Sequence, residues 1–226
     1  CVLWRDILAK AGKQIGSDLT ERPYALHMGY PKASSVIDHA HQTRAYLLKR
    51  KVLLGLYYLY VRLGLGFLRP FIRPVEQAIA NNVMIFDLVR EKLGVDVVVD
   101  SSKSYLKAVG LYLHDPVNVR VVLLTRDGRG VVWSNMKRGV ARPEVVTAWK
   151  NQYARALPLL EQHLKPEHLL RVKYEDLVLH PDEALSRLCA FIGLPFEPAM
   201  QDFQSKVHHV TNGNDMRMQR STTLRL

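Results

Sequence analysis

Arg126, Ser134 and Arg138 have the side-chain types and the spacing of a phosphate-binding site. A run of apolar, mostly β-branched residues at 119–124 predicts a buried strand that ends just before Arg126. Two glycines then mark a turn, and a helical pattern places Ser134 and Arg138 four residues apart on one face. Anions bind where parallel strands end and helices begin, and a guanidinium can bind two phosphate oxygens at once. The pattern therefore predicts a phosphate clamp, although an Arg-Asp pair after a strand is also common in ordinary solvated turns.

A second cation follows another predicted strand, at 95–99. Asp100 ends this strand, the two serines after it are expected to cap the next helix, and Lys103 is expected in the first turn of that helix. By itself this segment favours a simple cap followed by a surface lysine. If the two strands are neighbours, however, Lys103 and Arg126 lie at the same edge of the sheet, which favours a shared anion site.

Two further segments carry residues that could contact a nucleotide. A third predicted strand, at 168–172, leads into Tyr174, whose ring could lie against a base or a sugar. The tail after residue 201 has little periodicity and could close over a phosphate. Its polar loop contains His208, Gly213, Asn214, Met216 and Arg217.

The elements that position these residues alternate between strand and helix. Helices are expected at 103–113, 131–138, 144–164 and 181–192, between and after the three strands. Upstream, helical patterns cover 2–11, 37–68, as one helix or as two interrupted near Gly55, and a stretch from Pro74 to Lys92. Short apolar strands that alternate with helices predict an α/β fold, a three-layer parallel sheet with flanking helices.

Composition limits the classes of partner. The 226 residues carry a net charge of +11, which favours a phosphorylated or polyanionic partner or an anionic membrane surface. The cations are dispersed and not gathered with aromatic side chains, so we expect no nucleic-acid partner. Two cysteines exclude a disulfide framework, and His39 and His41 lack a third metal ligand.

The segment 52–68 is apolar nearly all round and is flanked by cations. A helix that spans a bilayer needs about 20 apolar residues, and Arg62 interrupts this segment. We therefore expect a buried or partner-facing helix, with peripheral membrane contact as the alternative.

With these residues in view, the chain resembles the sulfotransferases that use 3′-phosphoadenosine 5′-phosphosulfate, and within them the bacterial branch with an Asp-Ser-Ser-Lys motif. The segment TRDGRGVVWS at 125–134 is similar to the family's 3′-phosphate-binding segment and keeps its arginine-to-serine spacing. Gly128 stands where the family usually has proline. Three further segments resemble family motifs, namely CVLWRDIL at 1–8, RVKYEDL at 171–177 and HHVTNGNDMRM at 208–218.

The resemblance implies a P-loop NTPase-like sulfotransferase fold and a role for each candidate residue. Residues 1–226 would form a single partial domain, with a mostly helical acceptor-side region at 12–92 and the nucleotide-binding part at 93–226. Lys103 would neutralise or protonate the leaving group, and no metal would take part. The donor nucleotide would be bound by Arg126, Ser134, Arg138, Tyr174, Asn214 and Arg217. The acceptor would be a carbohydrate, lipid, tyrosine or small alcohol.

One family feature has no good counterpart here. The family's first strand and phosphosulfate-binding loop are imitated only at 30–35 and 220–223, and both imitations lack the inner glycine. We interpret the chain, which begins at Cys1, as a cytoplasmic fragment whose loop lay upstream, which leaves an upstream signal or anchor open. Such a fragment is expected to bind the nucleotide weakly and not to turn over. A P-loop nucleotide kinase and a non-catalytic module that binds polyanions remain the alternatives.

Overall fold

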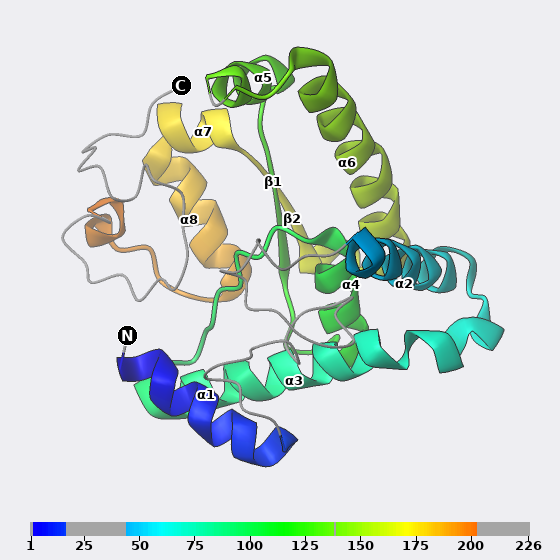
Figure 1. Cartoon of the computed structure of the whole chain (residues 1–226). Coiled ribbons are helices and arrows are strands. Elements are labelled where there is room, and N and C mark those ends of the chain that lie inside the picture. Colours follow the sequence, from blue (N-terminus) through cyan, green and yellow to red (C-terminus); the bar gives the residue numbers. More distant parts are fainter. Residues whose placement is uncertain (1, 17–43, 138, 203–226) are drawn as a thin grey trace. The chain divides into compact units, whose positions relative to one another are not determined.

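The computed structural model describes residues 2–16, 44–137 and 139–202 (Figure 1). These residues divide into two compact units, one within Cys1–His114 and the other within Asp115–His208.

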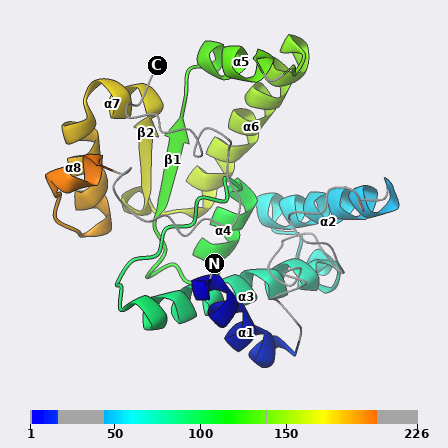
Figure 2. The ribbon, with the colours of Figure 1, turned by 60° about the vertical axis from the view of Figure 1, so that its left-hand side comes forward.

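The described part of the first unit is helical. Its elements are α1 (Val2–Ile15), α2 (Arg44–Leu63), the short 3₁₀ turn η3 (Gly66–Leu68), α3 (Arg69–Leu93) and α4 (Tyr105–His114). The long helix α3 contacts α1, α2 and α4 (Figure 2). Ile7 and Ala11 of α1 pack against Ile85 and Leu88 of α3, and all four side chains are buried. The core of this unit therefore forms around α3.

Two helix boundaries differ from the sequence expectation. Helix α2 runs through Gly55 without interruption and ends at Leu63, before Gly64 with its φ of +66°. Helix α3 begins at Arg69 and not after Pro74, because Pro70 fits the first turn, where a backbone N–H has no helical partner. It ends at Gly94, which adopts the left-handed conformation and donates its N–H to the Arg90 carbonyl.

The strand expected at 95–99 is wrong. The structure assigns no strand there, and no described segment pairs with these residues. Val99 is 81% exposed, and Val95 and Val97 are also open to solvent. An extended segment becomes a strand only when a neighbour accepts its backbone hydrogen bonds, which periodicity alone cannot supply.

The second unit has the expected α/β character, with a parallel pair of strands. Its elements are β1 (Val121–Thr125), α5 (Gly128–Met136), α6 (Arg142–His163), η4 (Pro166–His168), β2 (Leu169–Lys173), α7 (Tyr174–Leu179), α8 (Pro181–Ile192) and η5 (Pro198–Gln201). Strand β1 pairs with β2 in parallel from Val121 opposite Leu169 to Thr125 opposite Lys173. The crossover between them runs through α5 and α6 (Figure 1). Among the described residues, no helix is long and apolar enough to cross a bilayer.

Candidate functional site

The register of the two strands brings Arg126 and Tyr174 together. Thr125 and Lys173 are opposite each other at the carboxyl ends of β1 and β2, so the next residue of each strand leaves the sheet at the same place. The Arg126 guanidinium carbon lies 4.4 Å from the centroid of the Tyr174 ring. A cation at this distance from an aromatic face is attracted by the ring quadrupole. The ring therefore fixes the guanidinium where parallel strands end.

Helix α6 fixes the backbone of Arg126 from another direction. The Arg126 N–H donates to the Tyr153 hydroxyl at 3.3 Å, and the Trp149 indole N–H donates to the Arg126 carbonyl at 3.3 Å. The Trp149 and Tyr153 rings lie in contact, with centroids 5.0 Å apart. Both bonds involve main-chain atoms of Arg126, so its side chain takes no part in holding the loop.

Asp127 caps the helix that follows. Its carboxylate accepts the backbone N–H of Arg129 at 2.8 Å and also binds the Arg129 guanidinium at 2.7 Å. The hydrogen bonds from the Arg129 side chain, followed by that from its backbone, lower the pKa of Asp127 to about 2. The Asp127 N–H donates to Glu175 of α7 at 3.0 Å. The cap is therefore charged at neutral pH, and its carboxylate is directed at Arg129.

The Arg126 guanidinium lies against the first turn of α5. A Cβ at Gly130 would lie 3.3 Å from the Arg126 Nε, so a side chain there would press on the guanidinium. Ser134 is one helical turn beyond Gly130 on the same face of α5. We call Arg126, Gly130, Ser134 and Tyr174 the Arg126 corner. Among the described residues, no carboxylate pairs with the guanidinium, which leaves its donors for an anion at the N-terminus of α5.

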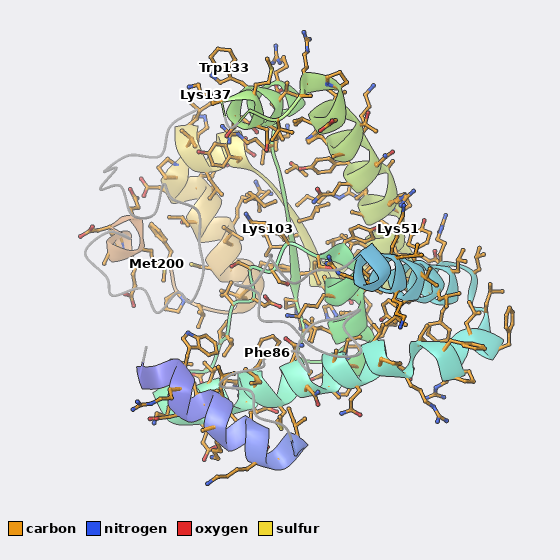
Figure 3. The ribbon with its side chains drawn as sticks, viewed as in Figure 1. Lys51, Phe86, Lys103, Trp133, Lys137 and Met200 are labelled. Carbon is orange, nitrogen blue, oxygen red and sulfur yellow. The ribbon has the colours of Figure 1, made fainter. Side chains whose placement is uncertain are left out.

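A hollow of about 550 Å³ lies between α5 and α6, beside the Arg126 corner but on another face of α5. Its apolar lining comes from Trp133, Met136 and Trp149 together with two valines, and cations surround it. Trp133 is 63% exposed and lies under the Lys137 ammonium, 5.2 Å from the ring centroid (Figure 3). The hollow includes neither Arg126 nor Ser134, so it is separate from the predicted phosphate clamp.

The Asp-Ser-Ser-Lys segment of the first unit lies before helix α4 and does not form the expected helix cap and first turn. Helix α4 begins at Tyr105, and Ser104 accepts the backbone N–H of Lys107, so Ser104 caps the helix in place of the two serines before it. Lys103 lies before the helix and not in its first turn. Asp100 accepts the backbone N–H of Ser102 at 2.9 Å and pairs with Lys107 at 2.8 Å. The ion pair with Lys107 thus neutralises the Asp100 carboxylate. No described carboxylate pairs with Lys103.

A model of the sulfotransferase family matches residues 72–198, more than half of the 226 residues. The chain belongs to the sulfotransferase family. Among solved structures, it is similar to a sulfotransferase domain from the curacin biosynthetic pathway, with 21% identity and a TM-score of 0.48 over 71% of this chain. The match covers 61% of that domain's length. No curated protein matches the chain.

The structure brings together only some of the sulfotransferase site residues that the sequence predicts. Arg126 and Tyr174 are in contact, and Ser134 is on the face of α5 that carries Gly130, beside which the guanidinium lies. Lys103 belongs to the first unit, so its place beside Arg126 stays a prediction, as does contact between Tyr174 and an adenine. Arg138, Asn214 and Arg217 lie outside the described residues. In the described ranges, no group of three or more histidine, cysteine or acidic side chains could bind a metal ion.

Three residues that hold the Arg126 corner were missed by sequence reasoning. Trp149 and Tyr153 are one turn apart on α6, and Glu175 follows Tyr174. The spacing of the two aromatic residues was a possible signal, but it is equally typical of a helix that packs on a core. The sequence does not show which loop the two aromatic side chains contact, because that depends on the path of the crossover from β1 to α6.

Trp149 also explains the glycine that replaces the usual sulfotransferase proline. A Cβ at Gly128 would lie 3.2 Å from two atoms of the Trp149 ring. Few real Cβ atoms approach so closely, and a proline would add further ring atoms at the same point. Gly128 therefore lets the indole pack against the loop.

Lys103 has a backbone conformation that glycine favours. Its φ is +61°, and no other described non-glycine residue has a positive φ. Because a Cβ in the left-handed region costs roughly 1–2 kcal/mol, and glycine loses about 0.5–1 kcal/mol more backbone entropy on folding, Lys103→Gly is expected to raise the free energy of unfolding by about 1 kcal/mol. Urea unfolding followed by circular dichroism measures this change. A loss of stability would show that the lysine side chain is needed to hold the loop. A gain would mean that the lysine is kept for another reason, as strained residues at functional sites are.

Proposed function

We propose that this chain belongs to an enzyme that transfers a sulfuryl group from 3′-phosphoadenosine 5′-phosphosulfate to a hydroxyl or amine acceptor, with residues 93–226 as its nucleotide-binding part. The observation that carries the proposal is the Arg126 corner, in which an arginine that pairs with no described carboxylate lies on the Tyr174 ring just before α5. Family membership supports sulfotransfer in general, and the corner supports the choice of donor.

The residues of the corner fit the 3′-phosphate of the donor. A phosphate is bound well by a planar guanidinium, a hydroxyl and the N-terminal end of a helix. Arg126 offers the guanidinium, and α5 offers the Ser134 hydroxyl and its first turn. The Tyr174 ring supports the guanidinium from one side, and the bare Cα of Gly130 lets it approach the helix. The 3′-phosphate distinguishes this donor from ATP, so the corner is a basis for selectivity.

The donor supplies the sulfuryl group and leaves as adenosine 3′,5′-bisphosphate. Negative charge grows on the leaving phosphate, so the protein's contribution is positioning and electrostatic stabilisation. By family resemblance, Lys103 would supply the cation at that phosphate. In any form of the protein that turns over, Lys103→Gly is expected to lower kcat more than donor affinity. We also propose a carbohydrate, lipid, tyrosine or small alcohol as the acceptor and a cytoplasmic location.

Titration calorimetry with two nucleotides tests the proposal. Adenosine 3′,5′-bisphosphate is expected to bind at least about tenfold more tightly than 5′-AMP, because only the former carries the 3′-phosphate that the guanidinium would bind. The preference is expected to be the same with magnesium and with a chelator present.

Three outcomes contradict the proposal. Equal affinity for the two nucleotides would remove the 3′-phosphate site. Binding that requires magnesium would favour a phosphotransferase of the kinase type. Binding that falls steeply with salt and does not distinguish the nucleotides would favour a module that binds polyanions.

A further inference from the structure

A stripe of exposed apolar side chains runs along α2 and continues into the start of α3. Its members are Leu48, Val52, Leu59, Leu63, Phe67 and Phe71, which we call the α2 stripe. Phe67 is 72% exposed and Phe71 is 62% exposed, values that are unusual for phenylalanine in a folded domain. The two phenylalanines follow the C-terminal end of α2, where the chain turns into α3 (Figures 1 and 2).

The stripe is a face of the helix and not a group of isolated side chains. Successive members within α2 are four, seven and four residues apart, which places them on one side of an α-helix. The opposite side is already buried, with Tyr57 at 2% and Val61 at 4% exposure. Helix α2 therefore packs on its own unit through one apolar side and presents a second apolar side outward.

The charges around the stripe all have the same sign. Between residues 44 and 75 the sequence contains no aspartate or glutamate. It contains seven cations, namely Arg44, Lys49, Arg50, Lys51, Arg62, Arg69 and Arg73. Lys51 and Arg62 are exposed on the side of α2 that carries the stripe (Figure 3 labels Lys51), and Lys49 borders its other edge. Arg69 pairs with Glu76 at 3.6 Å, the first acidic residue after this region.

We propose that the α2 stripe docks flat onto a membrane surface that contains anionic lipids. An interfacial helix combines leucine and phenylalanine on one face with lysine and arginine at its edges, so that apolar groups enter the headgroup region while cations meet lipid phosphates. The inference goes beyond the proposed donor site, because it concerns a different unit and a different partner.

Charge and side-chain type favour lipid over other occupants. A second copy of this chain would place the same cations opposite one another, which like-charge repulsion opposes. Nucleic acid would match the charge, but four of the six stripe side chains, all those on α2, are leucine or valine and offer no ring on which a base could stack. An anionic bilayer satisfies both the cations and the apolar side chains.

Vesicle co-sedimentation of the full chain tests the proposal. Binding is expected with phosphatidylcholine vesicles that contain about 30% phosphatidylserine, and it is expected to be at least about tenfold weaker with phosphatidylcholine alone. The double variant Phe67→Ser/Phe71→Ser is expected to bind at least about tenfold more weakly, because it removes both aromatic side chains of the stripe. The double variant Lys49→Gln/Lys51→Gln is expected to bind roughly twentyfold more weakly, at about fivefold per cation near an anionic surface.

Matched controls distinguish binding through the stripe from non-specific hydrophobic adsorption and from an effect of net charge. Val117→Ser removes an apolar group that is 73% exposed elsewhere, and Lys13→Gln/Arg155→Gln removes two exposed cations outside the region. Both are expected to bind vesicles like the unchanged protein. All substitutions are at exposed positions, so thermal unfolding is expected to be unchanged.

Several results would overturn the proposal. These are undiminished vesicle binding by the phenylalanine variant, equal binding to neutral vesicles, and equal losses in the charge-matched control. A dimer by light scattering that Phe67→Ser/Phe71→Ser converts to monomer would assign the stripe to a second copy. Nucleotide titration of the same variant distinguishes the two proposals, since its 3′-phosphate preference is expected to be unchanged.

Discussion

Arg126→Ala is expected to weaken the binding of adenosine 3′,5′-bisphosphate roughly a hundredfold while leaving affinity for 5′-AMP within about twofold. Truncating one partner of a hydrogen-bonded charge pair costs about 2–5 kcal/mol, and a hundredfold change corresponds to about 2.7 kcal/mol. The loop itself is expected to survive, because Trp149 and Tyr153 hold main-chain atoms of Arg126. Titration calorimetry with both nucleotides measures the effect, and circular dichroism checks the fold.

Two further variants make the result specific. Arg129→Ala is the matched control, because this arginine pairs with Asp127 and is not over Gly130. Its nucleotide affinity is expected to change little. Arg126→Lys keeps the charge but loses the planar fork, so an intermediate loss is expected. If Arg126→Ala weakens both nucleotides equally, or if Arg129→Ala has the larger effect, the arginine does not select the 3′-phosphate.

Gly110→Ala is expected to lower the free energy of unfolding by about 1 kcal/mol net, although alanine is the better helix former. A Cβ at Gly110 in α4 would overlap the Ile79 Cδ1 atom and lie 2.8 Å from the Tyr57 hydroxyl oxygen. Overpacking of this kind costs about 1–3 kcal/mol, more than the roughly 1 kcal/mol of helix propensity gained. Gly55→Ala is the matched control. Nothing lies within 4 Å of a Cβ there, so this variant is expected to be about 1 kcal/mol more stable.

A double variant tests the cause of the Gly110 effect. Ile79→Val removes the Cδ1 atom that the new methyl group would overlap, and by itself it is expected to cost about 1 kcal/mol. In the Gly110→Ala background, the same change is expected to be neutral or stabilising. Urea unfolding of the four proteins gives the coupling energy. Simple additivity would show that the close packing of α4 against α3 at this point is not the source of the cost.

The sequence predicted the local elements of the second unit well. Helix α8 has the predicted bounds, and β1 and β2 lie within about two residues of the predicted strands. These segments are strongly patterned, with a proline at the helix start and a mostly apolar run in each strand. The strand predicted at 95–99 is wrong because a short valine-rich run is also compatible with an exposed irregular segment. Periodicity is read from one segment, whereas a strand also requires a second segment that pairs with its backbone.

What the sequence by itself determined is the type of chemistry and the place on each element where it occurs. An arginine directly after a strand and a serine eight residues later, on the following helix, identified the Arg126 corner and the sulfotransferase family. Only the tertiary structure decided which residues meet there. The parallel register places Tyr174 on the guanidinium, and the crossover brings α6 to the loop with Trp149 and Tyr153. The physical reason is that spacing within an element follows from backbone geometry, whereas contacts between elements depend on how the whole chain packs.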